Sequence, residues 1–156
     1  MVVHGWTLLF HEAILGQLTT LAAADARARK ADPTRYRANA NVKVFAVLAK
    51  LILDVIPADP GRPEYRQGNT LGTAYRHWFR AKFLGRFRLF FRYDSGARVI
   101  IFAWVNDERS LRQRGGKRDP YEVFRRMLGS GHPPNDWAVL MRGSHQLPQN
   151  LLRPPE

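Results

Sequence analysis

The 156-residue sequence contains no cysteine. Disulfide bonds, cysteine-ligated zinc and a thiol nucleophile are therefore excluded, and the absence fits a reducing cytoplasm. Long apolar runs are missing as well, because no segment approaches the ~18 uninterrupted apolar residues of a membrane span. The start, MVVHGWTLLFHE, lacks the basic leader of a signal peptide. The sequence thus predicts a soluble cytoplasmic protein with no membrane partner.

Motifs for cofactors and metals are also missing. The sequence has no glycine-rich loop of the P-loop or dinucleotide-binding kind. Its five histidines show no spacing typical of metal ligands. The one tight acidic pair, Asp107 and Glu108, would point apart on a regular element. We therefore expect neither a cofactor nor a metal site.

Acidic residues are few. The sequence has 13 Asp and Glu against 25 Lys and Arg, which gives a net charge of +12 and a pI near 11.0. This excess predicts a polyanionic partner, namely a nucleic acid, an anionic membrane surface or an acidic protein. The alternative is a basic soluble protein without such a partner. Apolar residues make up 45% of the sequence, enough for a core, so we expect one domain over residues 1–156.

Hydrophobic spacing in the N-terminal half predicts helices. Residues 5–10 are apolar and aromatic and predict a strand, whereas residues 12–30 have apolar side chains at helical spacing. Asp32 precedes a proline and is the expected cap of a second helix that runs to about Ile56. Residues 57–72 are rich in proline and glycine, and a loop of this length is typically functional or mobile.

The second half predicts an antiparallel sheet. Three strand candidates, at residues 78–83, 87–93 and 99–105, are separated by short turn sequences. The third is apolar on both faces, so we expect it to be central and covered by a helix. A helix is predicted from Asp119 to about Leu128, and the proline-rich tail is expected to be loose at its end.

The segment FRAKFLGRFRLFFRY alternates basic with aromatic residues. Because strand side chains alternate between faces, one face collects Arg80, Lys82, Arg86, Arg88, Phe90 and Arg92. Like charges side by side repel one another, which favours anion binding over a role in solubility alone. We therefore predict an exposed RNA-binding face, on which arginines follow the phosphates and the Phe90 ring stacks on a base.

Metal-free RNA cleavage needs a base for the 2′-hydroxyl, cationic donors for the phosphorane and an acid for the leaving oxygen. Lys82 lies among arginines that disfavour its charged form, so it is a candidate base. Tyr121 and His132 are candidates for proton transfer. The plainer alternatives are a core tyrosine at a helix start and a histidine in an ordinary loop.

Several sequence blocks together resemble one known family. They are HGW, FRAKF, RFRLFFRY, WVNDE, LRQRGGKRDPYEVF and GHPPNDW, and they are similar to the YhaV toxins of bacterial type II toxin–antitoxin systems, within the RelE/ParE-like superfamily. The resemblance implies a RelE-like α+β fold, with N-terminal helices packed on a small, mainly antiparallel twisted sheet, then a C-terminal helix and tail. It also implies an endoribonuclease that cuts mRNA in association with the ribosome. A PrlF-like antitoxin of the AbrB type would inhibit it and provide its only link to operator DNA.

The resemblance also suggests roles for single residues. The late arginine of RelE-type enzymes corresponds here to Arg109 or Arg112, and their tyrosine to Tyr121 or Phe124. The predicted catalytic residues are Arg80, Lys82, Arg88, Arg112, Tyr121 and His132, and the predicted RNA-binding residues are Arg86, Phe90, Arg92 and Arg109. The rival function is a non-catalytic inhibitor of translation that binds RNA or the ribosome. A ParE-like toxin that acts on gyrase is a third interpretation, but the clustered basic and aromatic face suits RNA and does not support it.

Overall fold

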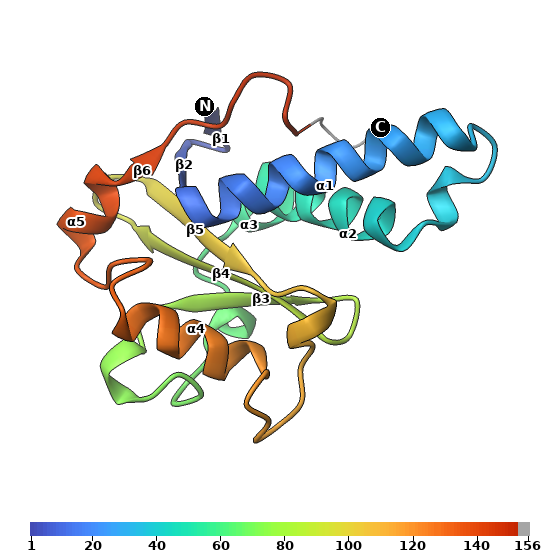
Figure 1. Cartoon of the computed structure of the whole chain (residues 1–156). Helices are drawn as coiled ribbons and strands as arrows, with labels where there is room; N and C mark the ends of the chain where they lie inside the picture. The colour runs from blue at the N-terminus through green and yellow to red at the C-terminus, as the bar shows by residue number, and fades with distance from the viewer. Residues whose placement is uncertain (153–156) are drawn as a thin grey trace.

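The computed structural model describes residues 1–152 (Figure 1). Within this range the sheet has six strands, in the spatial order β1 (Val2–Val3), β2 (Trp6–His11), β5 (Val99–Val105), β4 (Phe87–Asp94) and β3 (Phe79–Phe83), with β6 (Ser144–His145) paired to β2. Only β2 and β5 pair in parallel, and the other strand pairs are antiparallel. The predicted meander and the central position of β5 are confirmed.

Helices cover both faces of this sheet, as Figure 1 shows. On one face lie α1 (Glu12–Ala31), α2 (Ala40–Lys50) and the short α3 (Ile56–Ala58). On the other face lie α4 (Pro120–Gly129) and α5 (Trp137–Arg142). The predicted α+β class, with helices first and a mainly antiparallel sheet after them, is confirmed. Within residues 1–152, no helix combines the length and apolar character needed to cross a membrane.

The second helix begins later than its sequence suggests. Asn39 caps α2, because its side chain accepts hydrogen bonds from the backbone N–H groups of Asn41 and Val42. Asp32 was the predicted cap, and that prediction is wrong. Its side chain instead accepts from the N–H of Arg35 in a tight turn, so the chain reverses there. After α2 the helix continues with π-helical geometry through Leu51–Val55.

The face of the sheet toward α1 and α2 is an ordinary apolar core. Successive inward residues of three strands meet one side of the two helices and are buried with them: Leu8, Phe10, Leu89, Phe91, Ile100, Phe102, Ile14, Leu18, Leu48 and Ile52. Burial of this many large side chains is the main stabilising contribution to the fold. The predicted inward set of β4, which includes Leu89 and Phe91, is confirmed.

The opposite face was expected to be exposed, and that expectation is wrong. The Phe90 ring has no exposed surface, because it stacks on Phe124 of α4 with centroids 4.3 Å apart. A β-bulge in β5 leaves Ala103 without a partner and turns Trp104 toward the same side, where it stacks on Phe124 at 5.9 Å. The apolar side of α4 needs an apolar partner, and this face of the sheet provides it.

The long segment between α3 and β3 is ordered and packs against the sheet. Tyr65 and Leu71 are buried, and the Gln67 side chain accepts from Leu71 N–H and donates to the Tyr75 carbonyl. These hydrogen bonds from a side chain satisfy backbone groups that no helix or strand pairs, so the segment has a defined conformation. At the other end of the chain, the predicted loose tail falls mainly on residues 153–156, which lie outside the described residues.

Candidate active site

Two arginines on neighbouring strands meet at one tyrosine hydroxyl. Arg80 of β3 donates from Nε to Tyr121 Oη at 2.7 Å, and Arg88 of β4 donates from Nε to the same oxygen at 3.2 Å. All three residues are buried, with 9%, 6% and 4% of their surfaces exposed in that order. We call Arg80, Arg88 and Tyr121 the arginine–tyrosine site. The structure therefore brings together three of the six residues predicted to be catalytic.

Both guanidinium groups are held on one side and open on the other. Arg80 Nη1 donates to the Glu64 carbonyl at 2.7 Å, while Arg88 Nη1 donates to the carbonyls of Gly85 and Phe87. Neither Nη2 group makes a hydrogen bond within the described part of the chain, yet no buried side-chain nitrogen there lacks a partner. The two Nη2 groups are therefore not fully buried, and each has donors left for an anion.

Tyr121 is positioned by the start of α4. Asp119 caps this helix by accepting from Tyr121 N–H, and its other oxygen accepts from Arg112 Nη1 at 2.7 Å and from Gln113 N–H. The Arg112 guanidinium carbon lies 4.7 Å from the centre of the Tyr121 ring. Asp119, only 2% exposed, thus fixes both the ring and the arginine stacked on it.

This geometry decides between alternatives that the sequence left open. Arg112, not Arg109, lies beside the arginine–tyrosine site, because its guanidinium stacks on the Tyr121 ring. Arg109 is exposed, and its side chain makes no hydrogen bond or ion pair within residues 1–152. Tyr121, not Phe124, presents the hydroxyl, because Phe124 is fully buried against Phe90. The Phe90 ring is accordingly closed to a nucleotide base, and its predicted stacking role is wrong.

Lys82 and Arg86 flank the site at the surface. Lys82 is exposed on β3 and is the register partner of Arg88 on β4, so the predicted alignment of the two basic rows is confirmed. Arg86 is also exposed, and its Nε donates to the Arg112 carbonyl at 3.1 Å. Beside Lys82 a pocket of about 380 Å³ is lined by Arg80, Lys82 and Arg66 among others, a volume within the range of small-ligand sites.

Asn106 is a supporting residue that sequence reasoning missed. Its Oδ1 accepts from Arg88 N–H at 2.6 Å, and its Nδ2 donates to the carbonyls of Arg86 and Ser110. The buried amide thus ties the start of β4 to the loop that leads to Arg112. Its only signal in the sequence was a polar residue directly after an apolar strand.

Arg92 lies on the same face but in a different environment. Its guanidinium lies over the rings of Trp78 and Trp137, at 5.3 and 5.2 Å, and donates to the Asn135 carbonyl. Burial lowers the pKa of Arg92 to about 10, and the charge of Asp136 opposes this shift. Arg92 remains a cation at neutral pH, but it is engaged in holding the loop before α5.

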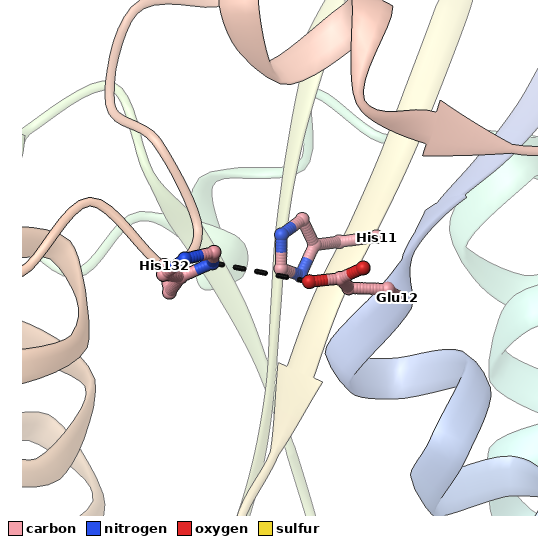
Figure 2. A group of neighbouring side chains, drawn as sticks. All are labelled: His11, Glu12 and His132. Carbon is pink, nitrogen blue, oxygen red and sulfur yellow. Dashed lines mark ion pairs between the residues drawn. The ribbon is translucent and has the colours of Figure 1, made fainter.

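His132 does not join the arginine–tyrosine site. Tyr121 lies in the first turn of α4, and His132 follows the last helical residue, Gly129. The helix alone, at ~1.5 Å rise per residue, therefore separates their backbones by roughly 12 Å. Figure 2 shows His132 beside His11 and Glu12, with its Nδ1 3.9 Å from Glu12 Oε1. Burial lowers the pKa of His11, Glu12 opposes the shift, and His132 and His145 add to it.

Comparison with known proteins defines the family. A family described as a toxin with endonuclease activity, of a toxin–antitoxin system, has a sequence model that matches residues 8–145. This chain belongs to that family, the YhaV toxins. It is 41% identical over 146 residues to the ribonuclease toxin YhaV of Escherichia coli K12, which covers 92% of this chain and 95% of the relative.

Other relatives agree with this assignment. The toxin YhaV of Escherichia coli O157:H7 is 41% identical, and that of strain CFT073 is 40% identical, over the same share of both chains. No solved structure matches the chain. Membership of the YhaV family confirms the expectation of a nuclease toxin from a toxin–antitoxin system. The roles of the individual residues remain predictions that rest on the geometry above.

Proposed function

We propose that the protein is a metal-independent endoribonuclease that cuts mRNA at the arginine–tyrosine site. The observation that carries this proposal is the convergence of two buried guanidinium groups on one tyrosine hydroxyl. Members of the family have endonuclease activity, and a relative is named a ribonuclease toxin. A site of this kind fits a substrate whose reacting group is an anion.

The two arginines are suited to the transition state of phosphoryl transfer. Attack of the ribose 2′-oxygen on the adjacent phosphorus builds negative charge on the equatorial oxygens of a phosphorane. The surface-facing Nη2 groups of Arg80 and Arg88 lie where they can donate to those oxygens. Fixed donors need no reorganisation as the charge develops, which is why such groups accelerate reactions strongly.

Tyr121 is suited to donate a proton. A hydroxyl has two acceptor positions and one donor, and two arginines already donate to the Tyr121 oxygen. Its own O–H is therefore directed away from them, and it donates to the leaving 5′-oxygen. Lys82, exposed and opposite Arg88, accepts the 2′-hydroxyl proton when it is in its neutral amine form. The products are a 2′,3′-cyclic phosphate and a free 5′-hydroxyl, and the two side chains return to their starting states through water.

The same charges favour chemistry without a metal ion. The arginine–tyrosine site and its neighbours Lys82 and Arg112 are all neutral or cationic, and a divalent cation among them would be repelled. The Asp119 carboxylate, which accepts from Tyr121 N–H, is already engaged by Arg112 and two backbone N–H groups. Arginine donors thus take the place that metal ions have in other nucleases.

The partners follow from the charge and the family. The exposed Arg86 and Arg109 extend the basic surface, and with a net charge of +12 this suits mRNA held on the ribosome. A PrlF-like antitoxin would neutralise the toxin with an acidic segment, and contact with operator DNA would pass only through that antitoxin. We place the protein in the bacterial cytoplasm, where mRNA and ribosomes are found.

The decisive experiment compares two tyrosine variants on end-labelled mRNA in EDTA, with and without translating ribosomes. Tyr121→Phe removes the donor at the site and is expected to slow cleavage ~10²–10³-fold with unchanged RNA binding. Tyr36→Phe is the matched control, because the Tyr36 hydroxyl also accepts from an arginine, Arg29, but lies on the exposed hairpin between α1 and α2.

Each result of this experiment is informative. Defined cuts by the wild type in EDTA support a metal-independent nuclease, and comparison of the lanes gives its dependence on ribosomes. Equal cleavage by both variants would remove Tyr121 from the mechanism. RNA that is bound and never cut, with ribosomes or without them, would instead favour inhibition of translation by occupancy.

A further inference from the structure

A second group of reactive side chains lies at the other end of the α4 face. His11 ends β2, Glu12 is the first residue of α1, and His132 lies in the loop after α4. Figure 2 shows the three side chains pointing toward one another. One ligand atom from each lies within 4.8 Å of the others. We propose that His11, Glu12 and His132 bind one divalent transition-metal ion of the zinc class.

The donor set fits this class of metal. Two imidazoles and one carboxylate are a known protein ligand set for zinc, with water in the fourth position. Zinc bonds of 2.0–2.2 Å at tetrahedral angles place ligand atoms about 3.3–3.5 Å apart. The three atoms, now within 4.8 Å of one another, must therefore close by at most about 1.5 Å. Imidazole donors also favour zinc, nickel and copper over magnesium and calcium.

The site combines one fixed ligand with two adaptable ones. His11 is buried, and its Nδ1 accepts from Ala13 N–H at 3.2 Å, so the chain holds its ring in place. The side chains of Glu12 and His132 are 65% and 75% exposed and can rotate toward a metal. Coordination at His11 Nε2 places the proton on Nδ1, so the 3.2 Å bond from Ala13 N–H is lost on metal binding and burial of the side chain alone then holds the ring in place.

The turn in the chain explains why adjacent residues converge. On a strand, His11 and Glu12 would point to opposite faces. The change from β2 to α1 falls between them, and this junction brings both side chains to one side. The partial positive charge at the start of α1 opposes a cation, and the Glu12 carboxylate offsets it. The third ligand, 120 residues later in the sequence, is visible only in the fold.

A bound ion would join the loop after α4 to the junction between β2 and α1. His132 and Glu12 are 3.9 Å apart, which is beyond hydrogen-bond distance. Coordination would fasten the loop after α4 to the start of α1, and thus fix the C-terminal end of α4. This role is separate from the arginine–tyrosine site at the other end of the helix, so it does not depend on the proposed function.

The test is zinc binding by untagged, EDTA-stripped and desalted protein. Calorimetric titration with zinc chloride is expected to show one ion per chain and a rise in melting temperature. Substitution with cobalt should give the strong visible absorption of a tetrahedral site. His132→Ala and Glu12→Gln should each weaken binding by more than the ~10–100-fold that loss of a supporting residue costs, without loss of the fold, because both side chains are exposed.

His4→Asn is the matched control. His4 is an exposed histidine that pairs with a carboxylate, Asp54, at 2.9 Å, so it reports on adventitious binding to any histidine–carboxylate pair. Binding that is kept in His4→Asn and lost in the other two variants supports the site. No binding by the wild type, or equal binding by all three variants, overturns it. Cleavage in EDTA is measured separately, so either proposal can fail without the other.

Discussion

The two faces of the sheet are built from the same strands but differ in what they bury. Toward α1 and α2, β4 presents Leu89 and Phe91 to a large cluster of buried apolar side chains. Toward α4, the same strand presents Phe90 between Arg88 and Arg92. The first face gives stability alone. The second combines a core in its centre with cations at its margins, where their charged ends reach the surface.

The difference shows how a small fold can bury arginines without a matching carboxylate. Arg80 and Arg88 satisfy their inner donors with backbone carbonyls and with the Tyr121 hydroxyl. A buried charge is costly unless it is hydrogen-bonded, so this network makes their positions tolerable. Because no acidic side chain within residues 1–152 pairs with them, the two cations are suited to bind a phosphate.

The largest expected effect tests whether both faces are true cores. Phe90→Ala and Phe91→Ala should each lower the free energy of unfolding by ~3–5 kcal/mol, because both rings are fully buried. Urea denaturation monitored by circular dichroism measures this. A Phe90→Ala protein that is as stable as the wild type but binds RNA more weakly would instead support the prediction from sequence that Phe90 is exposed and contacts RNA.

The next effect concerns the support of Tyr121. Asp119→Ala removes a helix cap and leaves the partly buried Arg112 without its carboxylate, so the free energy of unfolding should fall by roughly 2–3 kcal/mol. Asp136→Ala is the matched control, since Asp136 caps α5 but is exposed, and it should cost about 1 kcal/mol. An equal fall in the free energy of unfolding in the two variants would show that the ion pair between Asp119 and Arg112 does not stabilise the protein.

A smaller effect separates surface arginines from those of the site. Arg86→Ala and Arg109→Ala should each weaken RNA binding modestly. Each should also lower the slope of the logarithm of the binding constant against the logarithm of salt concentration by about one unit, as expected for a single phosphate contact. Arg35→Ala, an exposed arginine on the α1–α2 hairpin, should leave the slope unchanged. Filter-binding measurements across a salt series distinguish these results. An unchanged slope in Arg86→Ala and Arg109→Ala would show that neither side chain contacts a phosphate of the RNA.

The smallest effect is a pH dependence on the α4 face. Burial lowers the pKa of His77, its hydrogen bond to Asn135 opposes this, and Arg92 adds to it. The unfolded chain, with a histidine pKa near 6.5, then binds the proton more readily than the folded one. Stability from this group is complete above about pH 6.5 and is lost as the pH falls below that value.

His77→Gln tests this linkage, since its amide can still donate to Asn135. The fall in unfolding free energy between pH 7.5 and 5.5 should be smaller in this variant than in the wild type, as measured by urea denaturation at both values. An identical fall in the two proteins would show that His77 does not contribute to the acid sensitivity.

Some parts of the fold could be predicted from local pattern and others could not. The strands at Phe79–Phe83, Phe87–Asp94 and Val99–Val105 followed from alternation and turn residues, because both act over a few residues. The start of α2 was misplaced, since Asp32 and Asn39 are both good caps. Only the packing of the surrounding chain selects between them.

The site was predicted in part for the same reason. The alternation of basic and aromatic residues by itself determined that Arg80, Lys82 and Arg88 share one face of the sheet, because strand geometry fixes side-chain direction every second residue. It did not show what covers that face. A period of two describes a strand and carries no information about an element that is distant in sequence.

Tertiary structure alone decided the rest. It placed α4 over the basic face, buried Phe90, and brought the Tyr121 hydroxyl to two arginines. It also placed His132 next to His11 and Glu12, and not at the arginine–tyrosine site. These contacts join segments that lie tens of residues apart, and they exist because the apolar side of α4 has one large apolar surface to cover. The sequence determined which residues could act, and the packing of one helix determined which of them meet.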